Sequence, residues 1–342
     1  MRALVTGGSG FLGRAIVRRL LDRGAEVRSL SRGSRPGSEI PGVEPVRGDV
    51  ADAEILARAL AGCEIVFHTA ARVGGWGPWD DYQRTNVEGT ARLISACRRQ
   101  GVRKLVYTST PSVVHGGGDI EGGDESLPYA SRFEAAYPET KARAERLVLA
   151  SHDETLATVA LRPHLIWGPG DPHLIPRLLD RARAGRLWLV GTGDQLVDAT
   201  FLDNAADAHL LAADRLAPDA ACAGRAYFIA NGEPAPVREL IDGVLAAAGL
   251  PPVTRRMPAR MAWLAGAAAE LAAFGLRRRE EPPITRFAAR QLATAHWYDL
   301  GAARRDLGYA PIVSTAEGLR RLQTHLAGQA TASESESGAR ET

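Results

Sequence analysis

Cysteine is scarce in this sequence, and no apolar run is long. The three cysteines, Cys63, Cys97 and Cys222, lie far apart without metal-ligand or redox spacing, which argues against a disulfide framework and a zinc site. We expect them to be buried as small apolar side chains. The most apolar segment, residues 261–275, contains Glu270 and is shorter than the roughly 20 residues of a membrane span. It suits an amphipathic helix that covers a pocket, with a peripheral membrane contact as the alternative.

An excess of one charge is missing as well. The chain has 42 Lys and Arg against 40 Asp and Glu, a formal net charge of +2, and its arginines are dispersed among carboxylates. No basic run is present of the kind that nucleic-acid binding favours, so we expect no nucleic-acid partner. The first residues lead directly into an apolar strand without the pattern of a signal peptide. The sequence therefore predicts a cytoplasmic protein.

What is present is an alternation of short apolar runs with segments of helical period. Strands are predicted at residues 2–6, 26–30, 64–68, 104–109 and 158–161, and helices at residues 12–23, 53–60, 82–99 and 137–150. Such alternation is typical of the α/β class. It predicts a Rossmann-type, doubly wound parallel sheet with a smaller C-terminal substrate lobe.

The pattern loosens after Pro163, where turn clusters become frequent. We expect residues 1–163 to form mainly the Rossmann domain, whose cofactor is indicated by the motifs described next. Residues 164–326 should form mainly the substrate-binding lobe, with some chain returning to the sheet. Residues 327–342 are rich in Ala, Ser, Glu and Thr and lack aromatics, which predicts a disordered tail.

A glycine-rich turn separates the first predicted strand from the first helix. Its spaced glycines are Gly7, Gly10 and Gly13, and Phe11 and Leu12 stand where the helix begins. Glycine lets the backbone turn tightly and approach a pyrophosphate, whose charge then faces the N–H groups at the helix start. The strand–turn–helix context therefore predicts that these five residues bind a dinucleotide.

The end of the second strand indicates which dinucleotide is bound. NAD enzymes place an acidic residue there to hold the ribose hydroxyls, whereas this chain has Ser31 and Arg32. A hydroxyl and a guanidinium suit a 2′-phosphate, so NADP(H) is favoured. The alternative is that Arg32 and Arg35 are solvated loop charges and that either cofactor is accepted. Asp49, after the third strand, is placed to meet the adenine amino group.

Tyr137 and Lys141 are candidate catalytic residues because a spacing of four residues places both on one helix face. A free phenol titrates near pH ~10, so proton transfer at neutral pH needs a nearby cation, which Lys141 provides. Lys141 can also hold the nicotinamide ribose. Three hydroxyls at the end of the fifth strand, on Ser109, Thr110 and Ser112, are candidates for a hydrogen bond to the substrate oxygen.

These motifs, in this order, resemble the extended short-chain dehydrogenase/reductase superfamily over about residues 1–326. Further matches are the segment 86–90, Asn-Val-Glu-Gly-Thr, and Leu-Arg-Pro at 161–163. Within the superfamily the chain resembles the 3β-hydroxysteroid dehydrogenase-like branch. It is most similar there to the bacterial 2-alkyl-3-oxoalkanoate reductases of olefin biosynthesis, through residues 107–113, 165–171 and 226–234.

The resemblance implies reduction of the 3-keto group of a long-chain 2-alkyl-3-oxoalkanoic acid by NADPH, in a reversible reaction. Tyr137 and Lys141 carry over as the acid/base and its activator, and Thr110 aligns with the catalytic Ser/Thr, which is more often serine. Asn86 would be a supporting helix residue, and Pro163 would contact the cofactor. The expected partners are an apolar keto acid and a second copy in a homodimer, with a pathway enzyme or membrane surface as a further contact.

The substrate side is expected to be apolar. The glycine-rich loop 73–79 carries Trp76 and Trp79, and further apolar side chains follow at Trp167, Met261, Trp263, Leu264 and Phe274. These residues could line the substrate site or pack only in the core of the second lobe. His164 and His173 could meet a carboxylate or be structural.

Two other enzyme classes and one regulatory class are compatible with parts of the pattern. A 3β-hydroxysteroid dehydrogenase-like oxidoreductase is one alternative. A sugar-nucleotide epimerase or dehydratase shares the fold and the Tyr/Lys pair, but the residues after Pro163 are apolar where such enzymes carry an asparagine. An inactive NADP sensor would be expected to lack Tyr137 or Lys141, and both are present.

Overall fold

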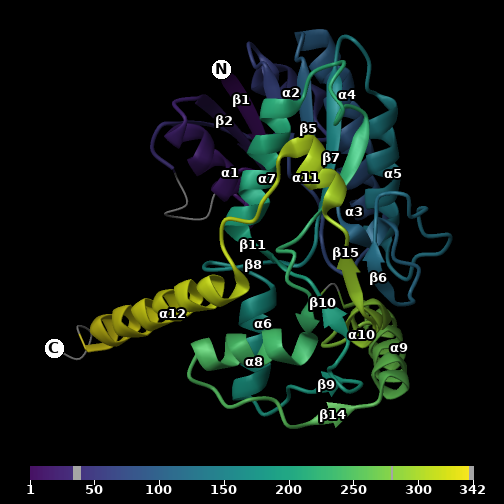
Figure 1. Cartoon of the computed structure of the whole chain (residues 1–342), viewed down its shortest axis with the longest axis vertical. Coiled ribbons are helices and arrows are strands. Elements are labelled where there is room, and N and C mark those ends of the chain that lie inside the picture. Colours follow the sequence, from purple (N-terminus) through teal and green to yellow (C-terminus); the bar gives the residue numbers. More distant parts are fainter. Residues whose placement is uncertain (34–39, 279, 339–342) are drawn as a thin grey trace.

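Seven segments of the chain form one parallel sheet, the central layer of the upper part of Figure 1. The computed structural model describes residues 1–33, 40–278 and 280–338, with side chains up to residue 329. The order across the sheet is β3 (Val43–Arg47), β2 (Glu26–Ser31), β1 (Arg2–Thr6), β4 (Ile65–His68), β5 (Lys104–Thr108), β7 (Ala157–Pro163) and β12 (Arg225–Ile229). The predicted Rossmann-type sheet is confirmed.

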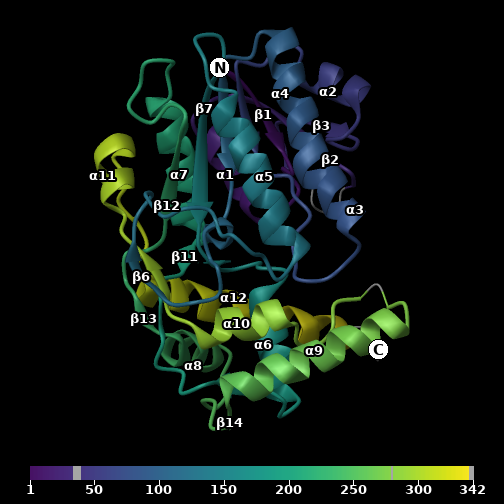
Figure 2. The ribbon, with the colours of Figure 1, turned by 90° about the vertical axis from the view of Figure 1, so that its right-hand side faces the viewer.

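Helices cover both faces of this sheet, because each strand places apolar side chains alternately above and below. Leu4 and Val5 are neighbours in β1, yet they lie in two separate buried clusters. One cluster includes α1 (Phe11–Asp22) and α7 (Leu202–Arg215). The other includes α2 (Ala53–Leu60), α4 (Gly89–Gln100) and α5 (Ala136–Ala150). Figure 2 shows α4 and α5 side by side in front of the sheet.

The region expected as one helix over residues 82–99 is interrupted. It consists of α3 (Trp79–Tyr82), a π-helical segment η1 (Gln83–Glu88) and α4. A π-turn inserts a residue into the helix and re-aims the side chains that follow, and such turns are frequent at functional sites. Here it carries Asn86, whose side chain is fully hydrogen-bonded, as described below.

The C-terminal half contributes one sheet strand and most of the lower lobe in Figures 1 and 2. The lobe contains α6 (Leu174–Arg183), α8 (Val237–Ala247), α9 (Ala259–Gly275) and α10 (Arg286–Ala293). A small sheet has the order β13 (Ala235–Pro236), β10 (Leu196–Val197), β15 (His296–Tyr298) and β6 (Ile120–Gly123). The remaining short strands are β8 (Ile166–Trp167) with β11 (Thr200–Phe201), and β9 (Leu189–Val190) with β14 (Arg256–Met257).

The structure bears on two expectations for the C-terminal part of the chain, the place of Trp167 and the form of the last residues. Trp167 is buried and packs edge-on against Phe201, 5.3 Å between ring centroids, so it belongs to the core of the lobe. In place of the tail predicted to be disordered from residue 327, α12 (Thr315–Gly338) continues as a helix to residue 338. The Ala and Glu residues of that segment are good helix formers, which the composition argument overlooked. Residues 339–342 lie outside the described chain.

Candidate active site

The turn between β1 and α1 is built so tightly that only glycine fits. Gly7 has φ +72°, and a Cβ there would lie 2.8 Å from the backbone nitrogen of Ala70. A Cβ on Gly13 would collide with the carbonyl oxygen of Gly7. Gly10 donates its N–H to the same carbonyl at 2.8 Å. The glycines therefore leave an open backbone cradle at the carboxyl end of β1.

The start of α1 faces this cradle. Gly10 is the N-cap residue and offers no side-chain hydrogen bond, and the first turn has no acidic residue. The first N–H groups of a helix lack intrahelical acceptors, so those of Phe11 and Leu12 are available to an anion, with the helix dipole in support. A dinucleotide pyrophosphate fits this arrangement.

The end of β2 places its polar residues beside the cradle. Ser31 is the last residue of the strand, and its carbonyl accepts the Gly48 N–H at 3.0 Å. Arg32 is exposed, and no hydrogen bond or ion pair engages its side chain among the described residues. Arg35 lies outside the described residues. No carboxylate follows β2 at the position that NAD enzymes use.

Asp49 and Pro163 occupy the same edge of the sheet, where the strands end. Asp49 accepts the Ala51 N–H at 2.9 Å and contacts Arg84 at 3.1 Å, so its carboxylate is held in place after β3. Pro163 is buried as the last residue of β7. Their contacts with adenine and with the cofactor stay predictions.

The predicted catalytic pair lies at the start of α5. Lys141 is 3% exposed, its Nζ donates to the Thr108 carbonyl at 2.5 Å, and it stands 4.1 Å from the Tyr107 ring centroid. Burial lowers the pKa of Lys141 to about 7, although Glu145 opposes that shift. Lys141 is thus a cation that the protein holds ready to exchange its proton near neutral pH.

Tyr137 lies one helical turn before Lys141, at the start of α5. Burial raises the pKa of Tyr137 to about 12, whereas the nearby Thr110 side chain acts to lower it. Thr110 is the N-cap of the short helix η2 (Pro111–Val113), and its Oγ1 lies 3.2 Å from the Ser112 Oγ. The Ser109 hydroxyl is buried without a partner in the described part of the chain. Of the three candidate hydroxyls, Thr110 is the one that acts on the pKa of Tyr137.

A buried ion pair fixes α5 against the sheet. Glu145 on α5 and Arg162 on β7 meet at 2.6 Å with side chains 0% and 4% exposed. Glu145 also accepts the Tyr129 hydroxyl at 2.8 Å. Removing one member of such a pair leaves an uncompensated buried charge. The Leu-Arg-Pro segment thereby helps to hold the catalytic helix in register.

A polar network missed by the sequence analysis lies behind the catalytic helix. His68, the last residue of β4, contacts the hydroxyls of Thr6 at 2.6 Å and Thr90 at 2.9 Å. Burial, with the charge of Lys141, lowers the pKa of His68 to about 3, so its ring is neutral. Thr90 donates to the Asn86 carbonyl at 2.6 Å. A histidine at the carboxyl end of a buried strand was the available signal.

Asn86 links this network to both the catalytic helix and the loop after β4. Its side-chain amide donates to Thr140 Oγ1 at 3.0 Å, and its side-chain oxygen accepts the Arg72 N–H at 2.8 Å. Thr140 directly precedes Lys141. This arrangement agrees with the supporting role expected for Asn86.

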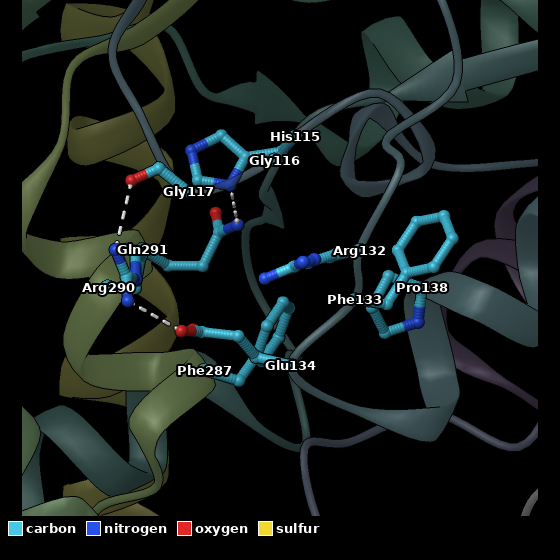
Figure 3. A pocket seen from close by; sticks show the side chains of 10 residues that line it. All are labelled: His115, Gly116, Gly117, Arg132, Phe133, Glu134, Pro138, Phe287, Arg290 and Gln291. Atoms are coloured by element: carbon cyan, nitrogen blue, oxygen red, sulfur yellow. Dashed lines mark hydrogen bonds and ion pairs between the residues drawn. The ribbon is translucent and has the colours of Figure 1, made fainter.

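A pocket opens beside the first turn of α5 (Figure 3). Its lining residues come from the loop after η2, the segment before α5 and α10: His115, Gly116, Gly117, Arg132, Phe133, Glu134, Pro138, Phe287, Arg290 and Gln291. Arg290 pairs with Glu134 at 2.7 Å, and Gln291 bonds the His115 ring at 3.1 Å. In Figure 3 the Arg132 side chain lies between these groups and Phe133. Arg132 has no ion pair or hydrogen bond within the described chain.

The residues expected on the substrate side separate into distinct places. Loop 73–79 contacts the lower lobe through Trp76, whose indole N–H donates to the Arg278 carbonyl at 3.2 Å. Trp79 is 37% exposed and stacks on Arg143. Trp263 is half-buried, with its indole nitrogen 3.5 Å from Glu134. Met261, Leu264 and Phe274 are 59–77% exposed, so they do not pack in the core of the lobe, and they do not line the pocket beside Pro138.

The two histidines considered for a carboxylate have structural surroundings. His164 is buried, contacts the Asp198 carbonyl at 2.6 Å and stacks edge-on with His296. His173 is the N-cap residue of α6, and its backbone N–H donates to Asp171.

The three cysteines are free and buried as expected. Among the described residues, no His, Cys, Asp or Glu group could hold a metal, and no helix is long and apolar enough to cross a membrane.

The chain is similar to several curated proteins over nearly its whole length. It is 54% identical to a 2-alkyl-3-oxoalkanoate reductase of Stenotrophomonas maltophilia, covering 94% of this chain and 98% of the relative. It is 48% identical to the protein of the same name from Shewanella oneidensis, covering 95% and 86%. It is 38% identical to a 3-beta-hydroxysteroid dehydrogenase of Mycolicibacterium neoaurum, covering 93% and 89%.

Solved structures share the fold across the chain. The UDP-glucose 4-epimerase of Thermus thermophilus, a complex with NAD, superposes with a TM-score of 0.74 at 27% identity, covering 96% of this chain and 99% of that one. The UDP-glucose 4-epimerase of Thermotoga maritima reaches 0.77 at 21% identity, covering 96% and 99%. The second similarity supports the fold alone.

The model of the 3-beta hydroxysteroid dehydrogenase/isomerase family matches residues 4–258 of the chain. This range includes the glycine turn, Thr110, Tyr137 and Lys141. The glycine cradle, which any Cβ would obstruct, fits the dinucleotide that such an enzyme needs. The chain belongs to the 3-beta hydroxysteroid dehydrogenase/isomerase family and is a nicotinamide-dependent oxidoreductase of the short-chain dehydrogenase/reductase type.

Proposed function

We propose that this enzyme reduces the 3-keto group of a long-chain 2-alkyl-3-oxoalkanoic acid to the 3-hydroxy acid, reversibly and with NADPH. The observation that carries the reaction type is the placement of Tyr137 at the start of α5 with Lys141 buried one helical turn further. The Thr110 side chain is near enough to lower the pKa of the Tyr137 phenol. The substrate class is supported by the two reductases at 54% and 48% identity.

The residues of the site divide the reduction between them. A bound NADPH supplies the hydride that adds to the carbonyl carbon. Thr110 donates a hydrogen bond to the carbonyl oxygen, and Tyr137 gives that oxygen its proton. Lys141, when protonated, stabilises the phenolate that remains on Tyr137 until solvent returns the proton. The hydride and the proton together convert the ketone into a secondary alcohol.

NADPH is supported by the end of β2. Ser31 and the exposed Arg32, which has no side-chain partner among the described residues, can donate hydrogen bonds to a 2′-phosphate. The sequence has no carboxylate at the position after β2 that NAD enzymes use. In the wild-type enzyme, kcat/KM with NADPH should exceed that with NADH by at least about tenfold, because charge-assisted hydrogen bonds contribute roughly 1.5–3 kcal/mol each. Equal efficiency with both cofactors would remove this part of the proposal.

An acid substrate is supported by the pocket beside Pro138. Arg132 lies exposed at the rim of the pocket and has no carboxylate partner among the described residues, whereas the neighbouring Arg290 is paired with Glu134. Phe133 and Phe287 place aromatic surface next to that cation. A substrate with a carboxylate beside an apolar chain would complement both properties of the pocket.

The deciding experiment is a steady-state assay with NADPH across 3-keto acids of increasing chain length, 3-ketosteroids and a UDP-sugar. We expect kcat/KM to increase with the chain length of the acid, since each buried methylene contributes up to roughly 0.8 kcal/mol. Turnover of a steroid alone would instead support the second candidate, a 3β-hydroxysteroid dehydrogenase, which the relative at 38% identity favours. Turnover of the UDP-sugar alone would contradict both.

A further inference from the structure

Lys141 is buried beside groups that supply no negative charge. Its Nζ donates to the Thr108 carbonyl and lies 4.1 Å from the ring centroid of Tyr107. Burial raises the pKa of Tyr107 well above its usual value, so its phenol is neutral. A carbonyl and a neutral ring stabilise an ammonium ion only in part, and burial favours the uncharged amine. A charged Lys141 therefore needs a carboxylate within electrostatic reach.

Glu145 is a carboxylate on the same helix face. It follows Lys141 by four residues in α5, so the two side chains project in the same direction. Its side chain is 0% exposed, and buried charges are screened much less than exposed ones. After burial, Glu145 is the largest cause that raises the pKa of Tyr107, whose ring lies beside the Lys141 Nζ. The three side chains therefore form one buried group against β5.

The charge of Glu145 is fixed by its hydrogen bonds. Its Oε1 accepts from the Tyr129 hydroxyl at 2.8 Å and from Arg162 Nη2 at 2.6 Å, and its Oε2 accepts from Arg162 Nε at 3.1 Å. An ionised carboxylate can accept all three. Buried ion pairs contribute little net stability, and Arg162 Nη1 has no hydrogen-bond partner within the described chain. Stability alone therefore does not account for this pair.

The other titratable side chains around Lys141 are neutral. They come from β4, β5, α3 and α5: His68, Tyr107, Tyr82 and Tyr137. Burial raises the pKa of each tyrosine and lowers that of His68 to about 3. The charged residues of η1, α3 and α4, which also pack against α5, are exposed, and η2 has none. Glu145, with its partner Arg162, is therefore the buried charge that Lys141 meets.

We propose that Glu145 is a positioning residue of the reduction: its buried carboxylate holds Lys141 as an ammonium ion at neutral pH. Burial lowers the pKa of Lys141, and Glu145 is the group that opposes this shift. Without the ammonium ion, the phenolate of Tyr137 would form beside no counter-charge. The consequence for Tyr137 rests on the proposed function, whereas the effect of Glu145 on Lys141 needs no substrate.

The test compares variants of the full-length protein that remove the carboxylate in two ways. Glu145→Gln removes its charge, and Glu145→Gln with Arg162→Gln removes both charges, so that no buried charge is left uncompensated. Glu145→Asp keeps the charge. The matched control is Glu139→Gln, the same change on the same helix, where the carboxylate pairs with the exposed Arg143 at 2.6 Å. Circular dichroism verifies that each protein is folded.

The first measurement is kcat at saturating NADPH and keto acid from about pH 5.5 to 9.5, a range in which a buried lysine can titrate. In the wild type, kcat should fall toward high pH as Lys141 loses its proton. The midpoint of that fall should move down by about one pH unit in both Gln variants, because the opposite charge is gone. It should stay in place in Glu139→Gln and near the wild-type value in Glu145→Asp. A pair that only holds the helix would lower kcat at every pH and leave the midpoint unchanged.

Urea unfolding provides a second measurement that needs no substrate. A lysine with a lower folded-state pKa loses its proton at a lower pH, so the penalty of its buried charge is relieved earlier as the pH rises. The stability difference between a Lys141→Met variant and its parent should therefore begin to shrink at a lower pH when the parent is the double Gln variant than when it is the wild type.

The proposal is overturned if the double Gln variant keeps the wild-type midpoint of kcat, or if its urea profile begins to change at the same pH as that of the wild type. It is also overturned if Glu145→Asp moves the midpoint as far as Glu145→Gln, since the charge would then not be the cause. A shifted urea profile in an enzyme that reduces no keto acid would contradict the proposed function alone.

Discussion

The candidate site has a cofactor half, the glycine turn between β1 and α1, and a substrate half, the pocket beside Pro138. The first is shaped by backbone and the second by side chains. The cofactor half is one continuous strand, turn and helix, in which Gly7, Gly10 and Gly13 shape the backbone itself. The substrate half is made of side chains that converge from segments about 160 residues apart, such as Arg132 and Arg290. A backbone site depends on local sequence, whereas a side-chain site depends on the packing of the whole lobe. Substitutions should therefore act on the two halves separately.

Tyr137 is expected to donate the proton and not to bind either the cofactor or the substrate. Removing its hydroxyl should therefore have the largest effect on turnover. Tyr137→Phe keeps the ring but removes the hydroxyl that serves as proton donor. We expect kcat to fall by about 10²–10⁴-fold, the usual contribution of general acid catalysis, with the Kd of NADPH nearly unchanged. Stopped-flow turnover and fluorescence titration of NADPH give the two values.

Tyr227→Phe is the matched control, because its hydroxyl bonds Asp306 at 2.8 Å on the far edge of the sheet. That variant should retain wild-type turnover. If Tyr137→Phe kept more than about a tenth of the wild-type kcat, another group would have to be the proton donor.

Lys141 is needed for activity, but burying its charge costs stability. We therefore expect its removal to abolish activity and to raise the free energy of unfolding. The folded-state pKa is about 7, below the value of roughly 10.4 of an unfolded lysine. Between those values the unfolded chain binds more protons, so this group makes the free energy of unfolding rise with pH. The penalty of the buried charge is complete below about pH 7 and is relieved toward pH 10.

Lys141→Met should therefore be inactive yet gain stability over the wild type at pH 6, by up to about 4 kcal/mol. The gain should shrink as the pH rises from 7 to 9. Urea unfolding of both proteins at several pH values measures it, and NADPH turnover confirms the loss of activity. A stability difference that stays constant over this range would mean that Lys141 keeps its proton when folded.

Gly13→Ala tests the cofactor half, because its Cβ would collide with the carbonyl of Gly7. The strained turn should open and weaken NADPH binding by about 10- to 100-fold, corresponding to the ~1–3 kcal/mol of overpacking. KM for the keto acid should change little at saturating NADPH. Gly118→Ala is the control, since nothing lies within 4 Å of the added Cβ. Unchanged NADPH binding in Gly13→Ala would refute the close approach.

The sequence could predict the features that depend on neighbouring residues, but not the contacts between segments far apart in the chain. The alternating burial of Leu4 and Val5, the glycine turn and the spacing of Tyr137 and Lys141 are local patterns, and the structure has the sheet and helices that they predict. The effect of Thr110 on the pKa of Tyr137 depends on how η2 lies against α5, which no spacing encodes.

The features that sequence reasoning missed depend on distant partners. His68 became part of the site because Thr6 and Thr90 come from two other elements. The apolar composition of residues 261–275 was visible in the sequence, but the direction of its side chains was not. The periodicity places Met261 and Leu264 on one face, and only the packing of α10 against the other face turns them to solvent.

Arg132→Gln tests the substrate half and should have the smallest effect of the four. Arg132 is exposed at the pocket rim and has no partner in the described chain, so its loss leaves no buried charge and should not disturb folding. A hydrogen bond between charged groups contributes roughly 1.5–3 kcal/mol when protected from water, and less at a solvated rim. We therefore expect KM for the keto acid to rise about tenfold while the Kd of NADPH stays constant.

Arg103→Gln is its control, because Arg103 is also exposed and its side chain has no hydrogen bond or ion pair among the described residues. It directly precedes β5, at the opposite edge of the sheet. A neutral substrate, the 3-ketone without the carboxylate, gives a second control within the same variant. Its KM should be the same for wild type and Arg132→Gln, since no charge pair is lost. If Arg132→Gln raised KM for the ketone and the acid alike, Arg132 would shape the pocket without recognising the carboxylate, and the substrate half would depend on packing alone.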